Sequence, residues 1–406
     1  MCCRSWGDCW MSKLYKIPDL LWFQEGPGVR NTQYTQNGVK LLNVANLVNG
    51  KVDLSTSNRY ISEEEAYGKY NHFLVDDGDF IIASSGIQVE YFDKKMGFID
   101  SSQLPLCMNT STIRFKVINK DILDIRYFMY FLKSSCFKKQ LSKQITGSAQ
   151  LNFGPSHLKK MTIPLIEIDK QKVIVTNLDK VTHTIDLCNS ILEKLDLLVK
   201  SQFVEMFGDP VINPKDWEKV YIGDVVTEVK YGTSRPAIDG GKYAYIRMNN
   251  LTYDGHLDLS DIKRIDIPDN EIEKCIVRKG DVLFNRTNSV ELVGKTCVFN
   301  ENEDMVIAGY IIRIRLKPYV LPLFLSSYMN TDVLKERLRE IAKGAVNQAN
   351  INAQELKAID MYLPPLNLQN QFADFVQQVD KSKLAVKKTL EKAETLKKTL
   401  MQEYFG

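Results

Sequence analysis

The sequence has few residues of the kinds that bind metals or form disulfides. Its 406 residues include only four histidines, which lie far apart: His72, His157, His183 and His256. The eight cysteines show no CxxC spacing, and most of those beyond residue 100 have apolar neighbours: Cys2, Cys3, Cys9, Cys107, Cys136, Cys188, Cys275 and Cys297. Dispersed cysteines of this kind are typical of reduced thiols in the cytoplasm rather than of a zinc or disulfide framework. We therefore expect a cytoplasmic protein with no bound metal.

Long apolar runs and a strong excess of charge are also absent. No apolar run approaches the roughly 20 residues of a membrane span, so we expect no membrane segment. Lys and Arg total 53 against 50 Asp and Glu, a formal net charge of +3, whereas a domain that binds nucleic acid by charge alone is usually more basic. The opening "MCCRSWGDCW" lacks the basic start and apolar core of a signal peptide. We interpret residues 1–11 as an extra N-terminal segment and hypothesise that the natural chain begins at Met11, which N-terminal mass spectrometry of the native protein would test.

Complete catalytic motifs are lacking too. Gly294-Lys295-Thr296 matches the end of a phosphate-binding P-loop, but Ser289 stands where that loop needs its first glycine. The chain has no HExxH zinc motif, no convincing pair of nuclease carboxylates, and no Asn/Asp-Pro-Pro-aromatic motif for amino methylation. We expect a chain that is not catalytic by itself. The alternative is a nucleotide-binding enzyme that uses Gly294–Thr296, and ATP binding by the isolated chain would favour it.

The sequence contains an internal duplication with a period of about 200 residues. Three pairs of segments match: 43–55 with 247–260, 76–86 with 278–288, and 147–153 with 344–351. Each copy then continues into a long helical segment that ends in Phe-Gly, at Phe207-Gly208 and at Phe405-Gly406. A repeat of this length indicates two duplicated domains rather than a solenoid.

The two helical segments each carry an apolar stripe in which spacings of four and three residues alternate, the pattern of a coiled coil. The members of the first stripe include Ile174, Leu178, Val181, Ile185, Leu192, Leu195 and Val199. Those of the second include Phe372, Val379, Val386, Leu390 and Leu400, interrupted by Lys383 and Lys397. Because a narrow stripe needs a partner, we predict that the two helices pair with each other within the chain. The alternative is that each helix packs separately on its own globular domain.

These patterns predict an α+β fold with a pseudo-two-fold duplication. Two similar globular mixed α/β domains are expected to be separated by two long antiparallel helices that form an intramolecular coiled coil. The expected boundaries are 12–167 for the first domain, 168–208 for the central helix, 209–367 for the second domain and 368–406 for the distal helix. Within the domains, "GDVLFNR" and "YIIRIRL" are typical of short strands, and residues 125–144 and 322–342 are helical in period. Asn49-Gly50 and Asp254-Gly255 are hairpin-type turn dipeptides.

Polar side chains that match the donors and acceptors of DNA base edges cluster in the predicted loops. In the second domain the candidates are Asn285, Arg286, Thr287, Asn288, Thr233, Ser234, Arg235, Asn347 and Gln348. In the first domain they are Arg30, Asn31, Gln88, Lys94 and Gln150. For any single residue a turn or helix cap is the commoner role, but the clustering favours a surface that recognises DNA.

The order of repeats, helices and motifs resembles the specificity subunit of type I restriction–modification enzymes. The motifs that carry the resemblance are "YGTSRPA" (231–237), "LFNRTNSVELVGKT" (283–296) and "LPPLNLQNQF" (363–372), and the likeness covers residues 12 to 406. It implies that each of two target-recognition domains recognises one half of a bipartite site in double-stranded DNA. It also implies that the helices dock two modification subunits, which bind S-adenosylmethionine and methylate adenine. Restriction (motor) subunits with ATP and Mg²⁺ are expected in the same complex, with no cofactor on this chain.

A stiff helical spacer suits such a role. A helix from Asp169 to Phe207 would span ~58 Å at about 1.5 Å per residue, which is enough to separate two major-groove contacts by one DNA turn of ~34–36 Å. The first domain has no close copy of the segment around Arg286, so the resemblance assigns roles to its residues less directly than in the second domain. The alternative to a DNA-recognition subunit is a coiled-coil scaffold that joins proteins and does not bind DNA. A mobility-shift assay with added modification subunit separates the two hypotheses.

Overall fold

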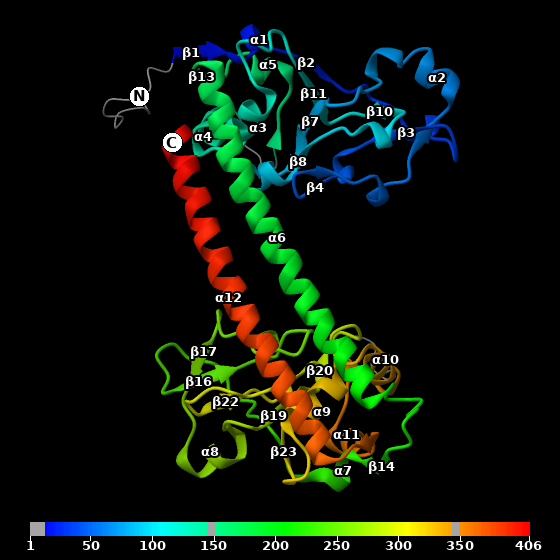
Figure 1. The fold of residues 1–406 in the computed structure, drawn as a ribbon, viewed down its shortest axis with the longest axis vertical. Helices are drawn as coiled ribbons and strands as arrows, with labels where there is room; N and C mark the ends of the chain where they lie inside the picture. Colours follow the sequence, from blue (N-terminus) through cyan, green and yellow to red (C-terminus); the bar gives the residue numbers. More distant parts are fainter. Residues whose placement is uncertain (1–12, 145–150, 343–348) are drawn as a thin grey trace. The chain divides into compact units, whose positions relative to one another are not determined.

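The computed structural model describes residues 13–144, 151–342 and 349–406. The chain divides into two compact units, which we call unit 1 (residues 1–187 and 389–406) and unit 2 (residues 188–388). Each unit therefore contains one globular part and a section of each long helix (Figure 1). Among the helices of the described residues, none combines the length and apolar composition needed to cross a membrane. No disulfide joins the cysteines of the described part.

Unit 1 is built on a four-stranded antiparallel sheet in the order β2-β11-β7-β9. Its strands are β2 (Leu21–Glu25), β11 (Thr112–Val117), β7 (Phe80–Ala83) and β9 (Met96–Phe98). A three-stranded sheet in the order β10-β3-β6 flanks it, with strands β10 (Leu106–Met108), β3 (Val39–Leu42) and β6 (Tyr60–Ile61). Two strand pairs complete the unit: β1 (Lys13–Lys16) with β13 (Thr162–Leu165), and β8 (Ser85–Ile87) with β12 (Leu151–Asn152).

Unit 2 repeats this plan, so the duplication predicted from the sequence is confirmed. Its main sheet has the order β15-β23-β19-β21, with strands β15 (Val226–Tyr231), β23 (Ile311–Leu316), β19 (Val282–Asn285) and β21 (Thr296–Val298). Its second sheet has the order β17-β16-β22-β18, with strands β17 (Lys263–Ile265), β16 (Tyr243–Ile246), β22 (Met305–Ile307) and β18 (Ile276–Val277). The matching strand pairs are β14 (Glu218–Tyr221) with β25 (Asp360–Leu363), and β20 (Thr287–Asn288) with β24 (Ala349–Asn350). The expected strands in "GDVLFNR" and "YIIRIRL" are β19 and β23.

Two predicted helices are each broken into two. Residues 125–144 form α3 (Ile125–Lys133) and α4 (Ser135–Gln144), and residues 322–342 form α9 (Pro322–Met329) and α10 (Asp332–Ile341). The break in unit 1 falls at Ser134, whose extended backbone interrupts the helix while its hydroxyl accepts a hydrogen bond from the Phe137 amide. In unit 2 Thr331, also extended, precedes α10. Short polar side chains at such positions compete with the helical hydrogen bonds, which the apolar period alone does not reveal.

Short elements connect the sheets. The short helices are α1 (Ile17–Leu20), α2 (Glu63–Tyr67), α5 (Pro155–Leu158), α7 (Ile222–Val225), α8 (Asp269–Cys275) and α11 (Ala353–Lys357). The hairpin predicted at Asn49-Gly50 joins β4 (Leu47–Val48) to β5 (Lys51–Val52). Both turn residues have positive φ angles, 49° and 80°, as the tightest hairpin turns require.

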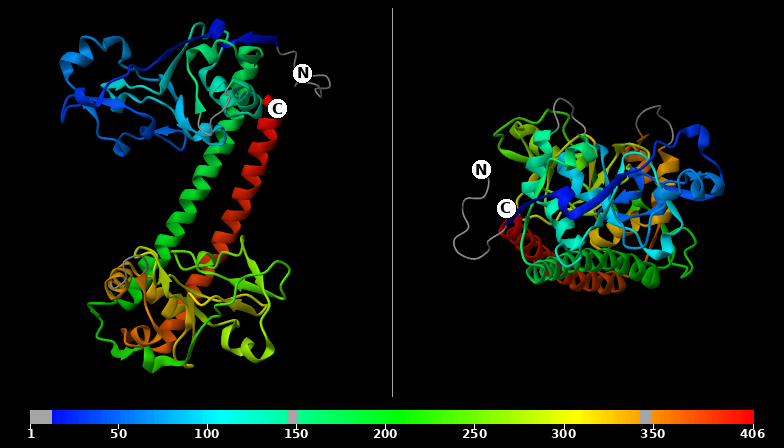
Figure 2. Two further views of the ribbon diagram at one scale, coloured as in Figure 1. Left: turned by 180° about the vertical axis from the view of Figure 1, so that it is seen from behind. Right: turned by 90° about the horizontal axis from the view of Figure 1, so that it is seen from above.

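The two long helices pair with each other in antiparallel directions, as predicted. They are α6 (Ile168–Phe207) and α12 (Leu366–Phe405), each 40 residues long. The beginning of α6 and the end of α12 belong to unit 1, where the Asn177 amide lies 3.4 Å from the Tyr404 hydroxyl. The opposite ends belong to unit 2, where the Lys383 ammonium lies 2.5 Å from the Asp196 carboxylate. Figure 2 shows the two helices side by side from two further directions.

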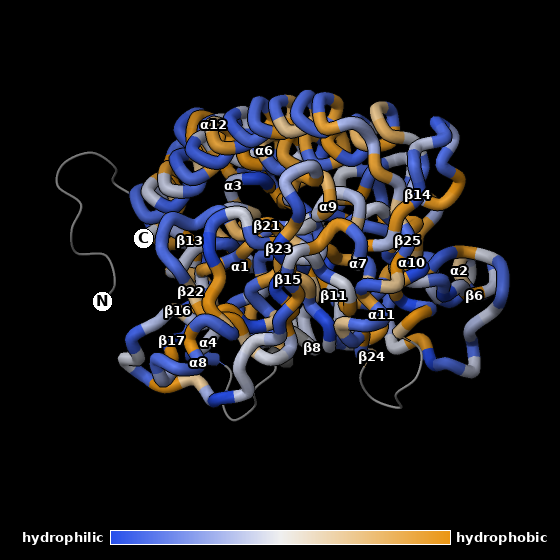
Figure 3. The backbone as a smooth tube through the Cα atoms, turned by 90° about the horizontal axis from the view of Figure 1, so that it is seen from below, coloured by the Kyte–Doolittle hydropathy of each residue, from blue (hydrophilic) through white to orange (hydrophobic). Residues whose placement is uncertain are grey.

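The predicted apolar stripes lie along this pairing. Ile174, Leu178, Phe372 and Val379 are buried, and Val181, Ile185, Leu192, Leu195, Val199, Val386, Leu390 and Leu400 are partly buried. Apolar and polar residues alternate along both helices in Figure 3. Near its ends the stripe joins the globular cores, because Leu178 belongs to the core of unit 1 and Phe372 to that of unit 2. Helices anchored in this way derive their stability from tertiary packing rather than from propensity alone.

A buried arginine occupies the same position in the equivalent inner strand, β11 or β23, of each main sheet. In unit 1 it is Arg114, which lies 3.2 Å from the buried Asp79 carboxylate and donates to the Leu74 carbonyl at 2.6 Å. In unit 2 it is Arg313, which is paired with Glu228 and donates to the Ile276 carbonyl. Each guanidinium thus joins the main sheet to the backbone beside it through charge-assisted hydrogen bonds.

Candidate nucleic-acid interface

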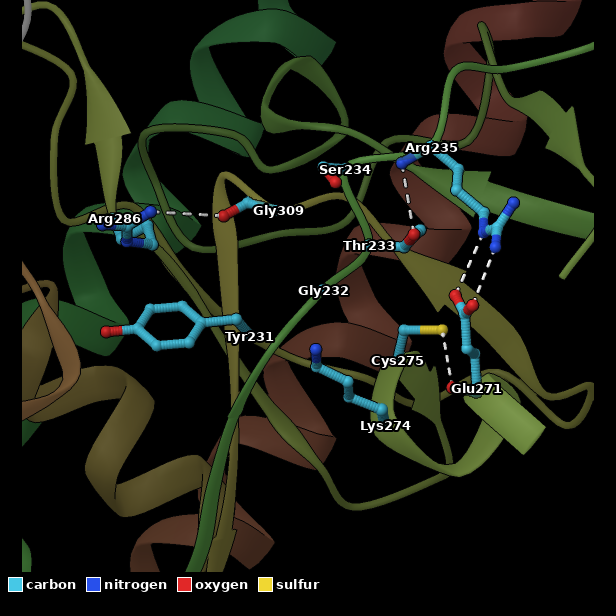
Figure 4. Close-up of a pocket in the computed structure, with 10 residues that line it drawn as sticks. All are labelled: Tyr231, Gly232, Thr233, Ser234, Arg235, Glu271, Lys274, Cys275, Arg286 and Gly309. Atoms are coloured by element: carbon cyan, nitrogen blue, oxygen red, sulfur yellow. Dashed lines mark hydrogen bonds and ion pairs between the residues drawn. The ribbon is translucent and has the colours of Figure 1, made fainter. Parts of the chain in front are cut away.

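Unit 2 has a polar pocket of about 640 Å³ where the end of β15 meets the loop after β19. We call it the Arg286 pocket. Figure 4 shows its lining residues: Tyr231, Gly232, Thr233, Ser234, Arg235, Glu271, Lys274, Cys275, Arg286 and Gly309. The pocket therefore brings together the motif "YGTSRPA" and the motif that contains Arg286. Four of the predicted DNA-binding residues, Thr233, Ser234, Arg235 and Arg286, line it.

Arg286 is held in a defined orientation. Its backbone amide donates to the Tyr310 carbonyl, and its carbonyl accepts from the Ile351 amide, both at 2.9 Å. The guanidinium lies 4.8 Å from the centre of the Tyr231 ring, and the Tyr231 hydroxyl is itself fixed by the Ala353 amide at 2.8 Å. Stacking on an aromatic face orients a guanidinium while its remaining N–H groups stay available to a ligand.

The backbone around the pocket depends on a glycine. A Cβ at Gly232 would lie 2.2 Å from the Ile307 carbonyl oxygen, so no other residue fits without a shift. The equivalent residue of unit 1 is Gly26, where a Cβ would lie 2.0 Å from the Asn109 carbonyl oxygen. Both loops therefore pass directly against a backbone carbonyl of a neighbouring segment, which fixes the path of the residues that follow each glycine.

Arg235 is engaged in a bidentate ion pair at the edge of the pocket. Its Nε and Nη2 atoms donate to the two oxygens of Glu271, at 3.0 and 2.7 Å. These hydrogen bonds lower the pKa of Glu271 below its usual range. Both side chains remain partly exposed, at 47% for Arg235 and 41% for Glu271, so a ligand can reach the pair.

Two other predicted residues of the Arg286 loop face inwards. Asn285 is fully buried, and its amide donates to the carbonyls of Thr287 and Tyr310, each at 3.1 Å. Thr287 is also buried and donates to the Asn350 side chain at 2.8 Å. Asn288 is partly buried and donates to Asn285 at 2.8 Å. In this conformation Asn285 and Thr287 shape the loop instead of facing a ligand, because their hydrogen-bonding groups are used within it.

Three predicted residues, Asn347, Gln348 and Gln150, lie outside the described residues. The strand β24, which begins directly after Gln348, pairs with β20, which begins directly after Arg286. The strand β12, which begins directly after Gln150, pairs with β8 of unit 1.

The Gly294-Lys295-Thr296 segment is part of the core and not a phosphate cradle. The Lys295 ammonium is buried and donates to the Met248 carbonyl at 2.6 Å. The Thr296 hydroxyl is fully buried and donates to the Gly294 carbonyl at 3.0 Å. A P-loop lysine must reach the phosphates of a nucleotide. Lys295 is directed into the protein, which argues against the nucleotide-binding alternative.

A second buried lysine, Lys335, supports the same turn. Because it is buried, the stability of the protein is expected to depend on pH. Lys335, 2% exposed, donates to the Gly294 carbonyl at 2.7 Å, and burial lowers its pKa from 10.5 to about 7. Between pH 7 and 10.5 the unfolded chain therefore holds a proton that the folded chain lacks, so stability rises with pH in this window. Relative to a Lys335→Met variant, the wild type should gain about 2 kcal/mol of unfolding free energy between pH 7 and 9. Urea denaturation of both proteins at each pH measures this difference, and parallel pH curves would contradict the assignment.

At the position equivalent to Arg286, unit 1 has the same backbone but different side chains. Ser84 repeats the backbone bonds of Arg286: its amide donates to Ser111 at 2.8 Å, and its carbonyl accepts from Phe153 at 2.9 Å. Its hydroxyl lies 3.4 Å from the Glu25 carboxylate. Glu25 ends β2 as Tyr231 ends β15. A hydroxyl and a carboxylate thus replace a guanidinium and an aromatic ring on one scaffold.

The predicted residues of unit 1 fall in two places. Gln88 and Lys94 line a pocket of about 530 Å³ together with Tyr91 and Lys95, whereas Arg30 and Asn31 are exposed on a separate loop. Beside this pocket Lys138 of α4 forms an ion pair with Asp93 at 2.9 Å. The resulting "lysine surface" consists of Lys94, Lys95, Lys138, Lys139 and Lys143. A cluster of this kind is suited to phosphate contacts.

Several pocket residues escaped the sequence analysis. Tyr231 is separated only by Gly232 from the residues chosen from "YGTSRPA", and an aromatic residue beside a glycine-containing loop was an available signal. Glu271 and Lys274 lie on α8, 36 residues or more from Arg235 in the chain, and no local pattern connects them to it. Their role depends on the tertiary fold.

Comparison with known proteins accounts for this architecture. A family model for the type I restriction modification DNA specificity domain matches residues 13–197 and 214–395. The chain is 23% identical over 269 residues to the type I restriction enzyme EcoKI specificity subunit of Escherichia coli (strain K12), and 22% identical over 268 residues to the StySPI specificity subunit of Salmonella potsdam. Each alignment covers 62% of this chain, and the chain spans 58% of the length of each curated relative.

The fold is also shared with a solved structure. The crystal structure of a type I restriction-modification system S subunit from M. genitalium has a TM-score of 0.59 at 14% identity, covering 99% of this chain and 98% of that one. The matched segments of the family model take up most of both units, including the Arg286 pocket. The chain therefore belongs to the family of type I restriction–modification DNA specificity domains.

Proposed function

We propose that this chain is the DNA-recognition subunit of a type I restriction–modification complex, with each unit recognising one half of a bipartite site in double-stranded DNA. The proposal depends on one observation: two structurally equivalent positions, one in each unit, carry side chains of different chemistry. At these positions unit 2 has Arg286, which lies over the Tyr231 ring, and unit 1 has the buried Ser84, which lies beside the partly buried Glu25. Two different sets of side chains on one scaffold suit a DNA site whose two halves differ in sequence.

The side chains of the Arg286 pocket match base-edge chemistry. A guanidinium can donate two hydrogen bonds to guanine, and hydroxyls such as that of Ser234 can donate or accept. The lysine surface of unit 1 offers charge to the phosphate backbone, which supplies affinity but little sequence information. Each unit on its own is a modest binder, but joining the two in one chain makes the second contact intramolecular and raises the overall affinity.

The paired helices are the proposed spacer and docking surface. Besides the paired stripe they expose large apolar side chains: Leu187, Leu197, Leu198, Leu384 and Leu396. Exposed apolar residues can mark protein interaction sites, and we assign these leucines of α6 and α12 to the docking of two modification subunits. The proposed modification subunits bind S-adenosylmethionine and flip the target adenine out of the duplex. The proposed restriction subunits bind ATP and Mg²⁺. In this scheme the chain itself holds no cofactor and catalyses no step.

Arg286→Ala tests the proposal directly. The variant is expected to weaken binding to the cognate site by about 1–3 kcal/mol, because a bidentate base contact is worth that much discrimination. The loss should disappear when the half-site recognised by unit 2 is already mutated. Titration of labelled duplexes with the complex of this chain and its modification subunit measures both quantities.

Arg278→Ala is the matched control, since Arg278 is a partly exposed arginine of unit 2 that does not line the pocket. It should leave half-site discrimination unchanged. An equal loss on cognate and unrelated DNA for Arg286→Ala would identify a phosphate contact instead. No sequence preference in the wild-type complex would favour a scaffold that does not recognise DNA.

A further inference from the structure

The Arg286 pocket has one carboxylate among its lining side chains, that of Glu271, beside three cationic ones, Arg235, Lys274 and Arg286. A pocket that bound only phosphate would gain nothing from an acid at its edge, since the carboxylate repels a phosphate group. Glu271 nevertheless takes both of its hydrogen bonds from Arg235, at 3.0 and 2.7 Å. In Figure 4 this pair stands at one side of the pocket, away from Arg286.

Both members of the pair are positioned by the backbone around them. The Arg235 amide donates to the Thr233 hydroxyl at 3.2 Å, and the Arg235 carbonyl accepts from the Tyr245 hydroxyl at 3.0 Å. Glu271 lies on α8, which is anchored by the buried Cys275. The backbone positions from which the two side chains extend are therefore fixed, while the ion pair itself remains accessible, at 47% and 41% exposure.

The pairing changes what Arg235 can bind. A lone arginine at a DNA surface binds any phosphate, which raises affinity for all sequences equally. Once its charge is balanced by Glu271, a phosphate gains less from the contact, whereas a base edge still gains the hydrogen bonds of the remaining N–H groups. The carboxylate is also an acceptor suited to the amino group of cytosine.

We propose that Glu271 is a specificity-determining residue. It orients the Arg235 guanidinium toward base edges and, by balancing the charge of Arg235, weakens the attraction of Arg235 to the DNA phosphates. This inference rests on the proposed function, because it assumes that unit 2 recognises a half-site in DNA. It adds to that function a residue on α8 whose role is to suppress binding to unrelated sequences.

Glu271→Gln tests the inference in the complex of the full chain with its modification subunit. The probes are a cognate duplex, defined by methylation mapping, and a duplex with the unit 2 half-site scrambled. We expect tighter binding to the scrambled duplex, with a plot of log K against log salt concentration steeper by about 0.9 because one more phosphate contact forms. The ratio of cognate to scrambled affinity should fall about five- to tenfold.

Glu273→Gln is the matched control. Glu273 lies on the same helix and makes an equivalent bidentate pair with Arg278, at 3.1 and 2.6 Å, but does not line the pocket. It should leave the affinity ratio unchanged, and Glu271→Gln should have little further effect once Arg235 is replaced by alanine. Equal effects of the two glutamate variants on the ratio would overturn the inference while leaving the proposed function intact. A wild-type complex with no preference for the cognate duplex would overturn both.

Discussion

Replacing Phe203 by alanine is expected to lower the unfolding free energy of unit 2 by about 3–5 kcal/mol, as for other large aromatic residues removed from a core. Phe203 is 1% exposed on α6, and its ring centre lies 4.9 Å from that of Phe207, 5.8 Å from Phe324 and 5.5 Å from Phe372. These partners come from α6, α9 and α12, so the cavity would open where both long helices join the globular part. Hydrogen exchange of unit 2 amides measures the loss.

Leu197→Ala provides the comparison on the same helix. Leu197 is 62% exposed, and its truncation should change stability by less than about 0.5 kcal/mol. A small effect of Phe203→Ala, or an effect equal to that of Leu197→Ala, would mean that the end of α6 is not part of the core of unit 2.

Arg114→Met is expected to destabilise unit 1 by about 3 kcal/mol, because it leaves the buried Asp79 carboxylate with only the more exposed Lys116 ammonium, 3.4 Å away, as a cationic partner. The substitution also removes the donors to the Leu74 carbonyl at 2.6 Å and to the Gln24 side chain at 2.7 Å. Each of these acceptors would still lose its contact with water on folding. It would no longer form the hydrogen bond that offsets the free-energy cost of that loss. Urea denaturation with hydrogen exchange of unit 1 amides measures the effect.

The matched change is Arg126→Ala in the same unit. Arg126 is 53% exposed and pairs with Asp179 at 2.9 Å. An exposed pair of this kind contributes no more than about 1 kcal/mol. Equal losses for Arg114→Met and Arg126→Ala would show that the buried network does not stabilise the sheet.

Periodicity and repetition predicted most of the fold. The stripes of α6 and α12 follow a heptad, which favoured paired helices, and the aligned segments around Asn49 and Asp254 indicated two copies of one domain. The breaks at Ser134 and Thr331 were missed, because one residue with an extended backbone interrupts a helix without disturbing its apolar period. Local patterns specify the elements well, while single backbone positions decide where they end.

The candidate site was less predictable. Arg286 and Arg235 were identified from their motifs, and the structure places both at one pocket. Asn285 and Thr287 come from the same motif, but their side chains are used inside the loop. The partners that orient the two arginines, Tyr231 and Glu271, depend on which strands and helices become neighbours. Residue type indicates what a side chain can bond to, but only the fold decides whether its partner is DNA or the protein.

Long-read methylation mapping, in cells that carry this chain with its modification and restriction subunits, tests the central claim most directly. If two unlike recognition units share one chain, modified adenines should lie in a motif of two different specific halves separated by a fixed number of unspecified base pairs. Arg286→Ala should relax one half and leave the other unchanged. A single continuous motif, or relaxation of both halves together, would contradict the account.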